Sequence, residues 1–309
     1  MNYLNIDSFE NRLNAWFRKK QDSVFVIEGP SQIGKTTFIQ NYVRRHAVPN
    51  LYIDVKKHKD FLSNLLDDVN SVNDFFTTLC FVLNKPFVSS HTLIIFDGVE
   101  YCPKLRLFYK RFIEYENVNI VAISCGASGP LHYRDRLIPS SETVEYYKPL
   151  NFYEFLIAIG QKLIAEHLRS SIINKLPISQ YLSSNLYRFY KIYNLVGGYP
   201  SSIQMYLTEN DLTRCIKNNS LILEKQFEHA ADLLDTEGRS LLFAIRDNLL
   251  SLITKKKYSS FDNYSAYRTK QIIQFLEEEH IFNIPTDLDI GDFSKLSSGK
   301  RIYLSHQCF

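Results

Sequence analysis

Residues 29–36 read Gly29-Pro30-Ser31-Gln32-Ile33-Gly34-Lys35-Thr36, with the spacing G-x-x-x-x-G-K-T. Four residues between the two glycines let the chain turn once around a phosphate, so that backbone N–H groups point inward. Lys35 is expected to bring its charge to the β- and γ-phosphates, and the Thr36 hydroxyl to complete the ligand shell of a Mg²⁺ ion. The stretch, continued by Thr37, therefore predicts contacts to ATP.

The residues on either side of this loop predict the elements that it requires. Val24-Phe25-Val26-Ile27 is a β-branched and aromatic run, typical of a strand buried on both faces. From Thr36 to Arg45, apolar residues recur at helical spacing, and basic residues close the segment. A strand, a glycine loop and a helix N-terminus in this order place a phosphate at the positive end of a helix dipole.

Length and composition are those of an ordinary globular protein. The 309 residues allow two or three domains, and the formal charge of +3 permits a nucleic-acid partner without requiring one. No apolar run approaches the ~18 residues of a membrane span, and Met1 to Asn14 lacks the apolar core of a signal peptide. The five cysteines are scattered and form no C-x-x-C pair, so we expect no disulfide framework, no zinc site and a cytoplasmic location.

Two later strands are predicted to end beside the loop. Thr92-Leu93-Ile94-Ile95-Phe96-Asp97 is an apolar run closed by an acid, which is typical of a Walker B element. An Asp at the carboxyl end of such a strand would hold Mg²⁺ through its water shell; the alternative is an ordinary strand that ends before a glycine turn. Asn119 to Ser124 predicts a further buried strand, and we expect Ser124 to lie near the γ-phosphate. Strands that alternate with helices predict an α/β fold with a parallel sheet.

Beyond residue 150 the strand pattern fades and helical periodicity dominates. The predicted helices span roughly 151–170, 180–196, 201–208, 213–235, 237–250 and 266–280, followed by two short strands near 280–284 and 301–304. Helices that precede a two-stranded wing are typical of a winged helix. We therefore predict three domains: a P-loop ATPase core at 1–150, a helical lid at 151–235 and a winged-helix-like domain at 236–309.

Two sequence segments outside the loop resemble those of a known family. Lys148-Pro149-Leu150-Asn151-Phe152-Tyr153-Glu154-Phe155-Leu156 is similar to the "P-L-S-F-x-E-F-L" signature of bacterial and archaeal AAA-type P-loop ATPases, at the junction of core and lid. Gly197-Gly198-Tyr199-Pro200 resembles the "G-G-x-P" of the lid in the same family. The resemblance implies an ATPase core followed by a lid, a winged helix and often a nuclease-like domain, with ATP and Mg²⁺ as ligands.

The chain departs from that family at two positions that concern hydrolysis. The family usually has Asp-Glu at the end of Walker B, whereas Asp97 is followed by Gly98 and the nearest acid is Glu100, our candidate for polarising the attacking water. The Gly-Arg that resembles an arginine finger is also missing, and Arg134 and Arg136 are the only arginines nearby. Loss of such an arginine in related NTPases lowers the rate by about 10³–10⁵.

The sequence therefore leaves several functions open. The first is a slow Mg-dependent ATPase, with Lys35, Asp97 and Glu100 as catalytic residues, that couples nucleotide state to lid and winged-helix geometry. The second is a switch that binds ATP without hydrolysing it and acts through protein or DNA contacts. Lysines and tyrosines at 255–270 are candidates for such contacts. The modest overall charge favours the alternative, in which the lysines cap a helix end and the tyrosines pack a small domain.

Two further expectations concern assembly and the C-terminal segment. A homo-oligomer whose neighbouring subunit donates an arginine is an open alternative. Arg301 to Phe309 resembles the first strand of the nuclease-like domain but has no acid at the family's position, so we expect no nuclease activity. Because no apolar run approaches the ~18 residues of a membrane span, we also expect no membrane association.

Overall fold

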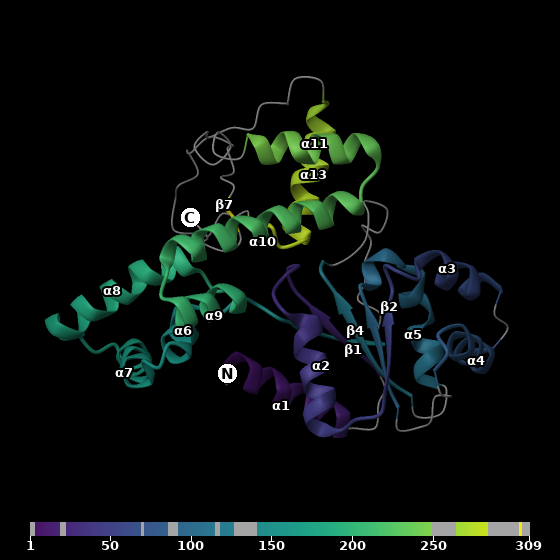
Figure 1. The fold of residues 1–309 in the computed structure, drawn as a ribbon, viewed down its shortest axis with the longest axis horizontal. Helices are drawn as coiled ribbons and strands as arrows, with labels where there is room; N and C mark the ends of the chain where they lie inside the picture. Colours follow the sequence, from purple (N-terminus) through teal and green to yellow (C-terminus); the bar gives the residue numbers. More distant parts are fainter. Residues whose placement is uncertain are drawn as a thin grey trace. The chain divides into compact units, whose positions relative to one another are not determined.

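The computed structural model describes residues 4–18, 23–68, 71–85, 92–114, 118–126, 141–248, 264–283 and 303–304. These residues belong to two compact units, drawn in Figure 1. The sheet unit comprises Ser8–Pro30 and Gly34–Tyr147, and the helical unit comprises Met1–Asp7, Ser31–Ile33 and Lys148–Phe309.

A five-stranded parallel sheet forms the centre of the sheet unit, in the order β2-β3-β4-β1-β5. Its strands are Val24–Glu28 (β1), Asn50–Asp54 (β2), Leu93–Asp97 (β3), Asn119–Ser124 (β4) and Glu142–Tyr146 (β5). Because all strands run in one direction, their carboxyl ends meet at one edge of the sheet. The predicted α/β fold with a parallel sheet is confirmed.

Helices cover both faces of this sheet, so the unit has three layers (Figure 1). One face packs against helices α3, α4 and α5, where the ring centroids of Phe75 and Phe112 lie 5.0 Å apart. The other face packs against α1 and α2, where the Phe9 ring lies 5.2 Å from Phe38 and 6.0 Å from Phe25. The bounds are Leu4–Arg18 (α1), Lys35–His46 (α2), Lys59–Asp68 (α3), Val72–Val82 (α4) and Lys104–Glu114 (α5).

Strand β5 is an element that the sequence did not predict. Its residues, Glu-Thr-Val-Glu-Tyr, are largely polar, yet they pair in parallel with β1 along the whole strand. Glu145 lies 2.8 Å from Arg12, and Glu142 lies 3.7 Å from Arg106. Because arginines neutralise these acids, the edge strand needs no hydrophobic pattern and gives no such signal.

The helical unit contains more breaks than the periodicity predicted. The helix expected at 151–170 is two helices, α6 (Phe152–Ala158) and α7 (Lys162–Ile173), separated by Gly160 with φ +80°. Strands β6 (Phe282–Asn283) and β7 (Tyr303–Leu304) pair antiparallel. The other described helices lie close to their expected spans: Gln180–Val196 (α8), Pro200–Glu209 (α9), Leu212–Asp232 (α10), Thr236–Asp247 (α11) and Ala266–Glu278 (α13). The division into three domains and the winged-helix assignment stay predictions.

The two segments that resemble the AAA family, residues 148–156 and 197–200, contact each other in the helical unit. The Leu150 N–H donates to the Gly198 carbonyl at 2.8 Å, and the Tyr193 hydroxyl donates to the Leu150 carbonyl at 2.9 Å. A Cβ on Gly198 would lie 2.3 Å from the Leu150 oxygen, so only glycine allows this approach. Asn151 and Glu154 form a capping box that starts α6 directly after the contact.

A cluster of charges between α1 and α2 predicts a pH-dependent contribution to stability. The Glu10 carboxylate accepts hydrogen bonds from Arg45 at 2.6 Å and from His46 at 2.8 Å. Burial opposes ionisation, but the bonds from His46 and Arg45 hold the pKa of Glu10 below its ordinary value of 4.5. A lowered folded-state pKa contributes stability above the unfolded-state pKa, and that contribution is lost as the pH falls through the folded-state pKa.

We expect Glu10→Gln to lower the free energy of unfolding by about 0.5 kcal/mol at pH 7, since the side chains of both partners, Arg45 and His46, are partly exposed. The difference from the wild type narrows below about pH 5 and is lost at lower pH. Urea denaturation at several pH values measures it, with Glu114→Gln, at an exposed position of α5, as the control. A difference that does not change with pH would contradict the assignment.

Candidate nucleotide-binding site

The loop between β1 and α2 has the backbone that its two glycines predict. Gly34 directly precedes α2 and has φ +97°, a conformation that side chains with a Cβ rarely adopt. A Cβ on Gly29 would lie 2.1 Å from the carbonyl oxygen of Tyr147, whose N–H donates to Glu28 at 2.6 Å. The end of β5 therefore requires glycine at position 29, and α2 presents its N-terminus at the far end of the loop.

Lys35 is held by the loop itself. Its side chain is buried, and Nζ donates to the carbonyls of Gly29 at 2.7 Å and Pro30 at 2.9 Å. A third contact joins Nζ to Cys125 Sγ at 3.4 Å. The predicted phosphate-binding lysine thus lies where the loop and the end of β4 meet.

The other loop positions differ in exposure. Ser31, Gln32 and Ile33 all belong to the helical unit. Ser31 and Ile33 are buried, whereas Gln32 is exposed and has φ +67°. Thr37 is exposed on the first turn of α2. Contacts of these residues to ATP stay predictions.

Thr36 and Asp97 come together as the sequence predicted. The Thr36 hydroxyl donates to Asp97 Oδ2 at 2.7 Å. The Tyr52 hydroxyl, from the neighbouring strand β2, donates to the same oxygen at 2.6 Å. Burial raises the pKa of Asp97, and the hydrogen bonds from Tyr52 and Thr36 act in the opposite direction.

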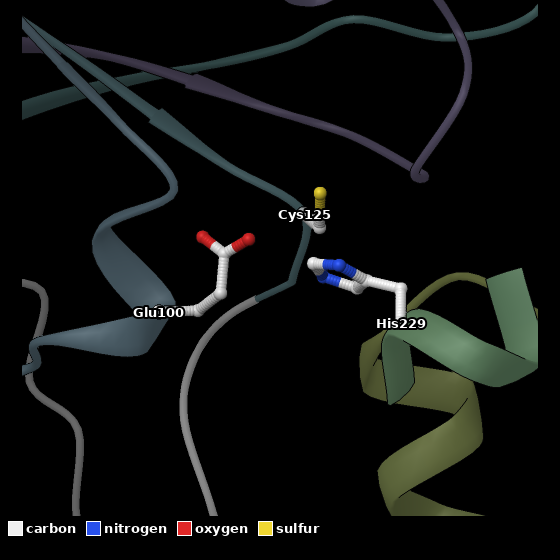
Figure 2. A group of neighbouring side chains, drawn as sticks. All are labelled: Glu100, Cys125 and His229. Carbon is white, nitrogen blue, oxygen red and sulfur yellow. The ribbon is translucent and has the colours of Figure 1, made fainter. Parts of the chain in front are cut away.

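Glu100 lies close to the site although it stands three positions after Asp97. Gly98 has φ +85°, and the turn it makes leads into the short 3₁₀ helix η1 (Val99–Tyr101). The Glu100 carboxylate is buried and lies within 4.8 Å of Cys125 Sγ. Figure 2 shows Glu100 reaching from η1 toward Cys125 at the end of β4; the third side chain drawn, His229, belongs to α10 of the helical unit.

Ser124 and Cys125, at the end of β4, make different contacts. The Ser124 hydroxyl is buried and donates to the Gly126 carbonyl at 2.6 Å, within its own turn. Its neighbour Cys125 makes the contact to Lys35. A sensing role for Ser124 stays a prediction, and Cys125 is a residue that the sequence reasoning missed.

Two residues of the site, Cys125 and Tyr52, were not predicted, and only Cys125 had a usable signal in the sequence. Cys125 directly follows a predicted strand, and the ends of parallel strands converge. The run Leu51-Tyr52-Ile53-Asp54-Val55 predicts a strand that contains Tyr52, but the approach of Tyr52 to Asp97 depends on the pairing of β2 with β3. Only the pairing reveals it, because 45 residues separate the two side chains.

Other predicted residues lie outside the site or outside the described residues. Arg134, Arg136 and the lysines at 255–257 fall in ranges that the structure does not describe. Within 264–270, Arg268 donates to both carboxylate oxygens of Asp235, at 2.5 and 2.6 Å, and joins α13 to the start of α11. None of the described helices is both long and apolar enough to cross a membrane.

The residues of the site fit a magnesium nucleotide. Thr36 and Asp97 offer a hydroxyl and a carboxylate, the hard oxygen ligands that Mg²⁺ prefers. The loop backbone needs glycine at both ends, because a Cβ would clash with Tyr147 at position 29 and would be strained at position 34, and the Lys35 ammonium bonds to this backbone. These features suit the phosphates of a nucleotide.

Comparison with known proteins places this segment in a family. Residues 21–156 match the family model described as an AAA domain. A search of curated proteins found no match. The matched segment contains the glycine loop and β3, and the match agrees with the resemblance to AAA-type P-loop ATPases.

Solved structures with similar folds share little sequence with this chain. The RuvB Holliday junction branch migration motor of Thermotoga maritima is 12% identical, with a TM-score of 0.39 over 92% of this chain and 90% of that one. The Aeropyrum pernix ORC1 protein in complex with DNA is 14% identical, with a TM-score of 0.38 over 98% and 88%. AMPPCP-bound DnaA from Aquifex aeolicus is 11% identical, with a TM-score of 0.39 over 90% and 88%. Because these TM-scores are below 0.5, the family assignment rests on the matched segment and on the site.

Proposed function

We propose that this protein binds ATP with Mg²⁺ at residues 29–37 and hydrolyses it slowly, and that nucleotide state changes the geometry of the lid and the winged-helix-like domain. The observation that carries the proposal is the 2.7 Å hydrogen bond between Thr36 and Asp97 beside the N-terminus of α2. It joins the end of the glycine loop to the end of β3, and the two side chains supply oxygen ligands that suit Mg²⁺.

Each residue then has a distinct role. Lys35 neutralises charge on the β- and γ-phosphates, while Thr36 and Asp97 hold the metal ion. Bound Mg²⁺ would neutralise the charge that develops on the transferred phosphoryl group. Glu100 accepts a proton from the attacking water, and its burial beside Cys125 supports this role.

A specific observation also favours the second candidate, a switch that binds ATP without turnover. The Ser124 hydroxyl is engaged with Gly126 rather than turned outward, and the family's acid directly after Asp97 is replaced by Gly98. Both features weaken the case for efficient hydrolysis while leaving the phosphate-binding residues intact.

Phosphate release by Glu100→Gln separates the two candidates. If Glu100 is the base, the variant loses about 10²-fold or more of the wild-type rate, and its affinity for Mg-ATP stays within about threefold. Glu114→Gln is the control, because it makes the same chemical change at an exposed position of α5. Tight ATP binding with no release by the wild type would support the switch instead.

The same assay tests assembly and partners. A rate per protomer that rises with protein concentration supports a homo-oligomer whose neighbour completes the site. A DNA partner at 255–270 would appear in a gel shift that weakens steeply with salt. No shift at low salt would exclude DNA and leave a protein partner for that segment.

A further inference from the structure

Tyr52 and Asp97 lie on one face of the sheet, close enough for a tyrosine to bridge them. In the pairing of β2 with β3, Tyr52 is opposite Ile95, and Asp97 is two residues further along β3. Side chains alternate along a strand, so Ile95 and Asp97 point to the same face. A diagonal neighbour at this offset is ~7–8 Å away, within reach of an aromatic side chain.

The hydroxyl of Tyr52 bonds to the carboxylate that this site would use for Mg²⁺. It donates to Asp97 Oδ2 at 2.6 Å, in the range of a charge-assisted O–H···O⁻ bond. Thr36 donates to the same oxygen at 2.7 Å. Within the described part of the chain, both hydrogen bonds to this carboxylate thus end on Oδ2, which fixes its rotation about the Cβ–Cγ bond.

The surroundings of the ring indicate that Tyr52 is more than a core residue. The ring is half-buried and borders a pocket of about 500 Å³, which Val43 and Arg44 of α2 and Ile95 of β3 also line. An ordinary core aromatic is packed on all sides. The specific contact of Tyr52 is therefore the bond between its hydroxyl and Asp97.

We propose that Tyr52 is a positioning residue for the metal ligand Asp97 and sets how tightly the ATP-bound protein holds Mg²⁺. The inference rests on the proposed function, since it concerns the same Mg-ATP site. Hydrogen bonds to a metal-ligating side chain orient it, and their loss typically weakens metal binding by about 10–100-fold.

The test is Tyr52→Phe, which keeps the ring and removes only the hydroxyl. ATP binding is measured by thermal shift and by calorimetry, first in EDTA and then over a Mg²⁺ titration. We expect the half-saturating Mg²⁺ concentration to rise about tenfold, while ATP affinity in EDTA changes less than about twofold. A half-saturating Mg²⁺ concentration that stays the same or falls would overturn the inference.

Two further variants distinguish positioning from packing. Tyr42→Phe removes a hydroxyl that donates to Asn14 Oδ1 at 2.8 Å in the same unit, so it is the matched control and should leave the Mg²⁺ response unchanged. In an Asp97→Asn background, Tyr52→Phe should have no further effect on Mg²⁺; an equal effect in both backgrounds would contradict the inference. A wild type that binds no ATP, or binds it independently of Mg²⁺, would overturn the proposed function and the inference with it.

Discussion

Lys35→Ala should bind Mg-ATP at least about 100-fold more weakly than the wild type while keeping its fold. The buried ammonium lies against the loop and donates to the carbonyls of Gly29 and Pro30. A point charge on the β- and γ-phosphates supplies charge-assisted contacts that alanine cannot replace. A 100-fold loss corresponds to about 2.7 kcal/mol of binding free energy, a usual size for a lost charged partner.

Calorimetric titration with Mg-ATP measures the loss of affinity directly. Lys110→Ala is the control, since it removes the same charge from an exposed position of α5. Melting without nucleotide must show that the variant is folded, because Lys35 also bonds the loop. Wild-type affinity in a folded Lys35→Ala protein would contradict the assignment of the site.

Gly29→Ala should destabilise the sheet unit by roughly 3 kcal/mol or more, even without nucleotide. The added Cβ would lie 2.1 Å from the carbonyl oxygen of Tyr147, a backbone atom that cannot move by itself. Tyr147 is tied to Glu28 by its own N–H, so relief of the clash requires the end of β5 to leave β1. The cost is steric and does not depend on ligand.

Fluorescence of Trp16, the single tryptophan, reports on the unfolding of this unit, because its ring lies 5.3 Å from Phe25 and its indole N–H donates to Ser23. Gly34→Ala is the control in the same unit: the residue has φ +97°, but a Cβ would meet nothing within 4 Å. Backbone strain alone should cost that variant about 1–2 kcal/mol. If Gly29→Ala were the more stable of the two, the predicted clash would be wrong.

Much of the fold could be predicted from local pattern. Four of the five strands of the sheet have continuous or alternating apolar residues, and they lie where the sequence predicts them. The fifth, β5, was missed because its glutamates are neutralised by Arg12 and Arg106, which are distant in sequence. The break at Gly160 was missed because apolar periodicity continues on both sides of it.

The site likewise contains residues that the local sequence predicts and residues that only the fold brings together. The glycine loop, Lys35 and Thr36 follow from the sequence alone, because adjacent residues would build the proposed phosphate cradle from their own backbone. The tertiary structure decided which side chains surround that cradle: it brings Tyr52 to Asp97, Cys125 to Lys35, and β5 against Gly29. These distances depend on strand order and register, which arise from packing across the whole sheet rather than from any local run of residues.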